Sequence, residues 1–245
     1  MQTALITGGG NGFGASVARA LHNAGFRVVI GDIDGQAAEH LAAELDPSGL
    51  TSMAVTLDVA KPDQIQSALE RIIARFGTAE VLVNNAARTE AKPVLEITPE
   101  AFNAVMGVNA GGTFAASQIF GRHFKANGYG RIINLASLAG QNGGTATGAH
   151  YAASKGAILT LTKVFARDLA PYGVTVNAIA PGPMDTPMVH AVLGEEKLAA
   201  FRANIPAGEL GDPGFVASLV VLLAAPAASF VTGACWDVNG GLYMR

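Results

Sequence analysis

The amino-acid sequence predicts an α/β fold, a doubly wound parallel sheet of about seven strands with helices on both faces. Short apolar runs rich in Val and Ile alternate with longer segments of helical period, which is typical of parallel strands joined by crossover helices. The expected strands are 3–7, 27–32, 51–57, 81–84, 131–136, 175–180 and 235–238. The expected helices are 14–24, 36–45, 62–76, 99–125, 151–169 and 214–223.

The chain of 245 residues contains no linker, repeat or low-complexity tract, so we expect one domain over residues 1–245. The segment at about 183–210 has helical patches between two core elements, which is typical of a lid over a binding site. Only 14% of the residues are charged, which predicts that other copies of the chain cover much of the surface. We expect a homotetramer whose contacts include the apolar C-terminal residues Trp236, Leu242, Tyr243 and Met244.

The overall charge and the termini exclude several partner classes. A net charge of -3 and a pI near 5.9 leave no basic stripe for a nucleic acid. The single cysteine, Cys235, cannot form an internal disulfide, and the N-terminus has no basic leader, so we expect a cytoplasmic protein. The longest apolar stretch, 215–228, is interrupted by Ser218 and Pro226 and is too short to cross a membrane.

A glycine-rich turn, TGGGNGFG at 7–14, follows the first strand directly and opens the first helix. Gly8 can form the tight turn, Gly12 lets a pyrophosphate approach the backbone at a helix N-terminus, and Gly14 allows close helix packing. A glycine-rich turn alone can also be a flexible loop. Its place in a strand-turn-helix unit predicts dinucleotide binding and a Rossmann-type sheet.

Asp32 ends the second strand, where a carboxylate can accept hydrogen bonds from both hydroxyls of an adenosine ribose. The same charge repels a 2′-phosphate by roughly 3 kcal/mol at about 6 Å and an effective dielectric constant of about 20. No cation follows it, because the next residues are Ile33 and Asp34. NAD(H) is therefore expected over NADP(H). The alternative is that Asp32 only ends the strand or caps the next helix.

Tyr151 and Lys155 are spaced i and i+4 on a predicted helix, which places both on one face. A phenol has a pKa near 10, and an adjacent ammonium group favours the phenolate that exchanges a proton with a substrate oxygen. Ser137 follows an apolar strand and should lie at the carboxyl edge of the sheet, within reach of that oxygen. These three residues predict hydride transfer at a carbon that bears a hydroxyl or carbonyl oxygen. Taken alone, the Tyr-Lys spacing would describe a surface pair.

The chain resembles the short-chain dehydrogenase/reductase family over essentially its whole length. The matching pieces are TGGGNGFG at 7–14, Asp58-Val59, NNA at 84–86, Asn109, Ser137, YAASK at 151–155 and PGPMDT at 181–186. The resemblance implies that Asn109 holds a water linking Lys155 to solvent, beside a kink at Gly111-Gly112. It implies a catalytic set of Asn109, Ser137, Tyr151 and Lys155.

The resemblance also implies how the cofactor is held. Asp58 and Val59 would hold the adenine, Asn85 and Ala86 would line the cleft, and Met184 and Thr186 would meet the carboxamide. The full expected cofactor set is Gly8, Asn11, Gly12, Phe13, Gly14, Asp32, Ile33, Asp58, Val59, Asn85, Ala86, Tyr151, Lys155, Pro181, Gly182, Met184 and Thr186. No metal site is expected, because the five histidines and one cysteine lack ligand spacing.

The sequence departs from the family pattern at two positions. Ala87 stands where the family commonly has glycine, which alters the substrate side of the cleft, and His150 precedes Tyr151. His150 could contact substrate, although a histidine at a loop end is more often a local hydrogen-bonding residue.

The substrate class is less sharply defined than the reaction. The chain resembles the β-ketoacyl carrier-protein reductases, but Asp32 predicts NADH, and Gly128 and Tyr172 stand where those enzymes carry cations for an acidic carrier protein. The expected pocket residues are Met184, Met188, Val189, Val192, Leu193, Leu198, Phe201 and Ile205, with Gln141, Asn142, Thr145 and Thr147.

Such a pocket favours a small or medium secondary alcohol or ketone, including polyols and sugar-derived alcohols. Reduction of a 3-oxoacyl thioester is the alternative. A non-catalytic NAD-binding sensor is a remote one, because a sensor should have lost Tyr151 or Lys155.

Overall fold

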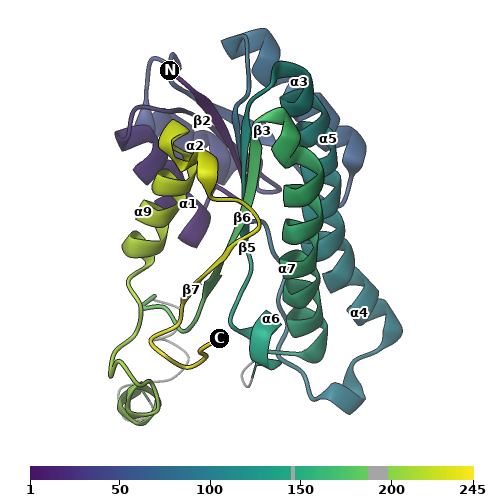
Figure 1. Ribbon diagram of the computed structural model, residues 1–245, viewed down its shortest axis with the longest axis vertical. Coiled ribbons are helices and arrows are strands. Elements are labelled where there is room, and N and C mark those ends of the chain that lie inside the picture. The colour runs from purple at the N-terminus through teal and green to yellow at the C-terminus, as the bar shows by residue number, and fades with distance from the viewer. Residues whose placement is uncertain (145–146, 187–197) are drawn as a thin grey trace.

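The computed structural model describes residues 1–144, 147–186 and 198–245, and they form the predicted α/β fold (Figure 1). All seven strands are parallel and lie in one sheet in the order β3-β2-β1-β4-β5-β6-β7. The strands are β1 Thr3–Thr7, β2 Arg27–Asp32, β3 Ser52–Thr56, β4 Val81–Asn84, β5 Gly130–Leu135, β6 Val174–Pro181 and β7 Cys235–Val238.

Helices cover both faces of this sheet. One apolar core lies between the sheet and α1 Gly12–Asn23, α2 Gly35–Leu45 and α9 Pro213–Ala224. The second core lies between the opposite face and α3 Pro62–Phe76, α5 Gly112–Asn127 and α7 Ala149–Leu169, and Figure 1 shows these two helical layers on either side of the strands. Since both faces are covered, the inner strands are wholly buried, and alternate residues of each strand enter opposite cores.

The strand order reverses between β1 and β4, the two central neighbours. The connections that leave their carboxyl ends diverge to opposite faces, and this divergence opens the crevice in which ligands of doubly wound sheets bind. Local signals fix where the surrounding helices start and stop. Asp34, Thr98 and Asp212 accept first-turn amide hydrogen bonds, and Gly77 and Gly128 end helices in the left-handed conformation.

The helix expected over 99–125 differs from a single regular helix. It consists of α4 Pro99–Met106, a π-helical segment η2 Gly107–Gly111, and α5. The sequence predicted a kink beside Asn109, and the structure places the π-helical segment there. Asn109 and Ala110 within this segment are buried.

Several short elements were not predicted because they are too short to show a helical period. They are η1 Val94–Glu96, α6 Ala139–Asn142, η3 Ala170–Tyr172 and η4 Pro226–Phe230. In the described ranges, no helix combines the length and apolar character needed to cross a membrane.

The lid expected at 183–210 is described only in part. Its residues Met188, Val189, Val192 and Leu193, like Thr145 of the preceding loop, lie outside the described residues. Leu198, Ile205 and Leu210 form a small apolar cluster with Phe201 and with Leu242 near the C-terminus.

Candidate functional site

The glycine-rich turn fits closely against the end of β4. Gly8 has a φ of +62°, and a Cβ there would lie 2.8 Å from the Cα of Ala86. A Cβ on Gly14 would overlap the Gly8 carbonyl oxygen. Glycine is therefore required at both positions for the first helix to start this close to the sheet.

Thr7 and Asn85 brace this turn across the switch point between β1 and β4. The Thr7 hydroxyl oxygen accepts the backbone N–H groups of Asn85 and Ala86, each at 3.1 Å. In return, the Asn85 Nδ2 donates to the carbonyl oxygens of Thr7 at 3.0 Å and Gly8 at 2.8 Å. Asn85 and Ala86 thus lie at this switch point, and Asn85 holds the glycine turn in place.

The N-terminus of α1 fits the pyrophosphate of a dinucleotide. Its N-cap residue, Asn11, makes no side-chain capping hydrogen bond, and Gly12, at a φ of +53°, has open space where a Cβ would project. An uncapped helix start with free room beside it favours an anion, because first-turn amides and the helix dipole point there. Phe13 belongs to this turn, but it is half-buried and packs against the core beneath.

Asp32 faces the glycine turn from the end of β2. Its Oδ2 accepts the N–H of Gly10 at 2.8 Å, and its Oδ1 accepts the N–H of Asp34 at 3.0 Å. Asp34, and not Asp32, caps α2, by accepting the N–H of Ala37 at 3.1 Å. Each Asp32 oxygen keeps a further lone pair, as ribose hydroxyls would require, and Ile33 beside it is 73% exposed.

Asp58 and Val59 follow β3 and have different surroundings. The Asp58 backbone N–H donates to the Gln64 side chain at 2.8 Å, and its carboxylate lies 3.8 Å from the Lys61 ammonium. The Val59 side chain is buried and faces Gly112, where a Cβ would come within 2.7 Å of it.

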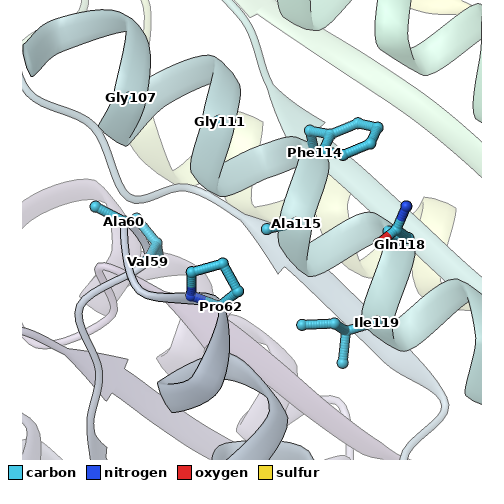
Figure 2. Close-up of a pocket in the computed structure, with 9 residues that line it drawn as sticks. All are labelled: Val59, Ala60, Pro62, Gly107, Gly111, Phe114, Ala115, Gln118 and Ile119. Atoms are coloured by element: carbon cyan, nitrogen blue, oxygen red, sulfur yellow. The ribbon is translucent and has the colours of Figure 1, made fainter. Parts of the chain in front are cut away.

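A hollow of about 300 Å³ lies beside Val59 (Figure 2). Its other lining residues come from the loop before α3, from the start of α3 and from the η2–α5 helix. Ser137, Tyr151 and Lys155 are not among them. It is therefore distinct from the predicted catalytic residues. It is lined by Val59, Ala60, Pro62, Gly107, Gly111, Phe114, Ala115, Gln118 and Ile119.

Ser137, Tyr151 and Lys155 come together at the carboxyl edge of β5. Burial raises the pKa of Tyr151, and a hydrogen bond with Ser137 lowers it in part. Burial lowers the pKa of Lys155 to about 8. The Lys155 ammonium donates to the Leu135 carbonyl oxygen at 2.5 Å and lies 5.6 Å from the centre of the Tyr151 ring.

The expected lowering of the Tyr151 pKa by Lys155 is therefore not present in the protein by itself. Desolvation of the phenolate is the larger effect, and the Ser137 hydroxyl is the group that opposes it. The adjacent ammonium lies over the ring, and its hydrogen bond is directed to the end of β5.

Asn109 is wholly buried, and its side chain is fully engaged. Its Oδ1 accepts the N–H of Arg88 at 2.7 Å, and its Nδ2 donates to the Arg88 carbonyl at 2.9 Å and to Ser154 Oγ at 2.9 Å. Ser154 Oγ in turn donates to the Tyr151 carbonyl oxygen at 2.7 Å. Asn109 thus ties the loop after β4 to the helix that carries Tyr151 and Lys155.

The segment after β6 approaches β7 closely. Pro181 accepts the N–H of Leu138 at 2.9 Å, and a Cβ on Gly182 would lie 2.8 Å from the Cα of Asn239. The Met184 side chain is buried in the core and packs on Gly211. Thr186, the other residue expected near the carboxamide, is half-buried.

His150 is wholly buried rather than open at the loop end. Its Nδ1 accepts the N–H of Tyr151 at 3.0 Å, and its Nε2 has no hydrogen-bond partner among the described residues. Ala87 is exposed.

Thr7, Arg88 and Ser154 hold the site residues in position, and the sequence assigned no role to any of them. Thr7 and Ser154 lie within the TGGGNGFG and YAASK motifs, but most of the bonds that these residues make join segments far apart in the chain. Within the described ranges, no group of three or more His, Cys, Asp or Glu side chains is arranged to hold a metal ion.

Comparison with known proteins agrees with this geometry. The family model described as enoyl-(acyl carrier protein) reductase matches residues 8–243. The 3-oxoacyl-(acyl-carrier-protein) reductase FabG of Vibrio cholerae is 37% identical over 245 residues, covering 99% of this chain and 98% of that protein. The sorbitol dehydrogenase of Cereibacter sphaeroides is 35% identical over 254 residues, covering 99% and 98% respectively.

A crystal structure of a putative gluconate dehydrogenase from Agrobacterium tumefaciens superimposes with a TM-score of 0.92 at 33% identity, covering 98% of this chain and 95% of that one. Fold, motifs and these full-length similarities agree. The chain belongs to the short-chain dehydrogenase/reductase family of oxidoreductases.

Proposed function

We propose that this protein is an NAD(H)-dependent dehydrogenase that interconverts a small or medium secondary alcohol and its ketone. The observation that carries the proposal is the grouping of Ser137, Tyr151 and Lys155 at the carboxyl end of β5, on the same edge of the parallel sheet as the N-terminus of α1, which follows β1. One group can hold the substrate oxygen, one can exchange its proton, and one supplies positive charge.

In the oxidation direction, the Ser137 hydroxyl donates a hydrogen bond to the substrate oxygen, and the Tyr151 phenolate accepts the hydroxyl proton. A nicotinamide cofactor, when bound, would supply the hydride acceptor and, in its oxidised form, a positive charge. In the reduction direction, Tyr151 returns the proton to the oxygen. The positive charges of Lys155 and of the oxidised nicotinamide together would offset the burial that disfavours the phenolate.

The preference for NAD(H) rests on Asp32. One carboxylate oxygen accepts the Gly10 N–H of the glycine turn and the other accepts the Asp34 N–H, so the negative charge is fixed at the end of β2, where the adenosine ribose would bind. Among the described residues, no ion pair neutralises it. The charge therefore disfavours a 2′-phosphate there.

We also propose a single-domain, cytoplasmic homotetramer. Exposed apolar side chains support self-association. Phe114 on α5 is 44% exposed and its ring centre lies 5.8 Å from that of Phe165 on α7. Phe215 and Leu222 on α9 are more than half exposed.

The second candidate is 3-oxoacyl-thioester reduction, and one contact favours it. Tyr172 stands at one of the two positions where the carrier-protein reductases carry a cation. The exposed Lys125 ammonium lies 4.1 Å from the centre of the Tyr172 ring, so a cation lies next to that position in this protein. Such a cation can attract an acidic carrier protein. The similarity to the reductase of Vibrio cholerae points the same way.

Replacement of Tyr151 by Phe tests the main proposal. Tyr151→Phe should reduce turnover by at least about a thousandfold, because the proton donor is lost, and should leave the NADH dissociation constant within about twofold. Tyr129→Phe is the matched control, since the Tyr129 hydroxyl has no hydrogen-bond partner among the described residues. Retained turnover in Tyr151→Phe would overturn the assignment.

A screen of NADH oxidation separates the two candidate substrates. Simple ketones, sugar-derived ketones and acetoacetyl thioesters are compared at equal concentration by kcat/KM. Selectivity for ketones and sugar-derived ketones supports the main proposal. Strong selectivity for the thioester favours the second candidate, and Lys125→Ala should then lower kcat/KM for a carrier-protein thioester but not for a coenzyme A thioester.

A further inference from the structure

The C-terminal residue is bonded, through two other side chains, to the short helix that follows Ser137. Arg245 donates from Nε to the Asp237 carboxylate at 2.9 Å and from Nη2 at 3.2 Å. Asp237 also accepts from Gln141 Nε2 at 2.6 Å, and Gln141 belongs to α6. Figure 1 shows the C-terminus close to α6, although about a hundred residues of chain separate them.

The Asp237 carboxylate is the centre of this arrangement, which we call the C-terminal clamp: Gln141, Asp237 and Arg245. A fourth donor, Cys235 Sγ, lies 3.4 Å from the same carboxylate, and burial together with Asp237 raises the pKa of this thiol to about 12, so it stays protonated. Arg245 also donates to the Cys235 carbonyl oxygen at 2.6 Å. The Asp237 side chain is 21% exposed and that of Arg245 is 45% exposed, so the clamp lies at the surface of the protein.

Helix α6 has little stability of its own. It spans four residues, and one turn of helix fixes several dihedral angles for a single internal hydrogen bond. Its position must therefore be set by its neighbours. On one side it packs on α7, because a Cβ on Gly140 would lie 2.5 Å from the Lys155 backbone carbon. On the other side, the Gln141 side chain fastens it to β7.

Ser137 is attached directly to this helix. Its hydroxyl oxygen accepts the N–H of Ala139 at 3.1 Å, and its carbonyl oxygen accepts the N–H of Gly140 at 3.0 Å. Any movement of α6 is thus transmitted to the hydroxyl that bonds Tyr151. The clamp does not contact the glycine turn, whose partners are Thr7, Asp32 and Asn85.

We propose that Gln141, Asp237 and Arg245 are positioning residues: the C-terminal clamp holds α6 against α7 and thereby aligns Ser137 with Tyr151. This inference rests on the proposed function, in which Ser137 holds the substrate oxygen. Loss of the clamp should lower kcat through misplacement of Ser137. It should leave cofactor binding unchanged, because the dinucleotide cradle is built from other residues.

The test uses the full-length protein with Asp237→Asn, Gln141→Leu and Arg245→Ala. Each should lower kcat by roughly 10- to 100-fold, as an ångström-scale misplacement of a catalytic group can. The NADH dissociation constant should stay within about twofold. Glu44→Gln, which breaks the exposed Arg19–Glu44 pair on the opposite helical layer, is the matched control and should leave kcat unchanged.

A double variant separates positioning from general damage. If Gln141 and Asp237 act through one hydrogen bond, the Gln141→Leu/Asp237→Asn enzyme should lose no more kcat than the worse single variant. Additive losses of kcat would contradict the proposal that these two residues act through one hydrogen bond. Light scattering is recorded for every variant, and a loss of kcat that appears only in variants that dissociate would also overturn it.

Amide hydrogen exchange supplies a readout that needs no turnover. Exchange at 139–142 should quicken in all three single variants and stay unchanged in Glu44→Gln. Unchanged exchange overturns the inference whatever the activity. Faster exchange with normal kcat also contradicts the inference, because α6 would then have lost its fixed position while Ser137 still worked normally. Failure of the proposed function is distinguishable, because it would show as unaltered turnover in Tyr151→Phe.

Discussion

The Lys155 ammonium donates a 2.5 Å hydrogen bond to the carbonyl oxygen of Leu135, the last residue of β5. Lys155 is only 3% exposed, and burial lowers its pKa to about 8. A strand carbonyl is a weak substitute for water or a carboxylate around a full charge. The fold therefore holds this cation beside Tyr151 at a cost in stability.

Lys155→Met should make the protein more stable at pH 7 and inactive. The pKa falls from 10.5 in the unfolded chain to about 8 in the folded protein, which corresponds to a penalty of roughly 3 kcal/mol below pH 8. Loss of the bond to Leu135 leaves one unpaired carbonyl and offsets about 1–3 kcal/mol of the gain. Urea denaturation at pH 7 measures the net effect, and lower stability would contradict this account.

The sign of the pH dependence provides an independent check. Between pH 8 and 10.5, the unfolded state binds more protons at this position than the folded state, so the contribution of Lys155 to stability rises with pH. The difference in unfolding free energy between Lys155→Met and the parent should therefore shrink across that window. A difference that stays constant from pH 7 to 10.5 would show that Lys155 is not buried as a charged group.

Asp32→Asn should relax cofactor selectivity. The parent should favour NADH over NADPH by about a hundredfold in kcat/KM, from a repulsion of roughly 3 kcal/mol. Asparagine keeps an oxygen for the Gly10 N–H but removes the charge, so kcat/KM for NADPH should rise at least about tenfold. Asp168→Asn, at an exposed position on α7, is the control. Equal use of both cofactors by the parent would refute the role given to Asp32.

Gly14→Ala should weaken both folding and NADH binding. The added methyl group would overlap the Gly8 carbonyl and the Asn85 amide, so the turn must shift, at a cost of about 1–3 kcal/mol. Gly107→Ala is the matched control, because its Cβ would meet no atom within 4 Å and the residue is helical. The control should be neutral or up to about 1 kcal/mol more stable. Thermal denaturation measures the change in stability, and NADH fluorescence titration measures the change in affinity. Equal stability and affinity of Gly14→Ala and Gly107→Ala would contradict the close packing of the glycine turn.

The sequence predicted the sheet well because each strand is a short apolar run bounded by turn residues. The expected bounds of β1, β2, β4 and β7 agree with the structure. Prediction was poorest where bonding is not local. The four-residue helix α6 is too short to show a helical period. The sequence predicted the position of the interruption at η2 but not its π-helical form. The electrostatics of Tyr151 also escaped prediction, since burial depends on everything packed around the ring.

The sequence by itself determined the strand-turn-helix unit at the N-terminus, the spacing of Tyr151 and Lys155 on one helix, and the acid at the end of β2. These features depend on neighbours within a few residues, where chain geometry fixes which side chains share a face. Only the tertiary structure decided that Asn109 ties Arg88 to Ser154, that Met184 turns into the core, and that Arg245 reaches α6 through Asp237. Such contacts join residues that are distant in the chain, and they form only when the sheet brings its strand ends to one edge.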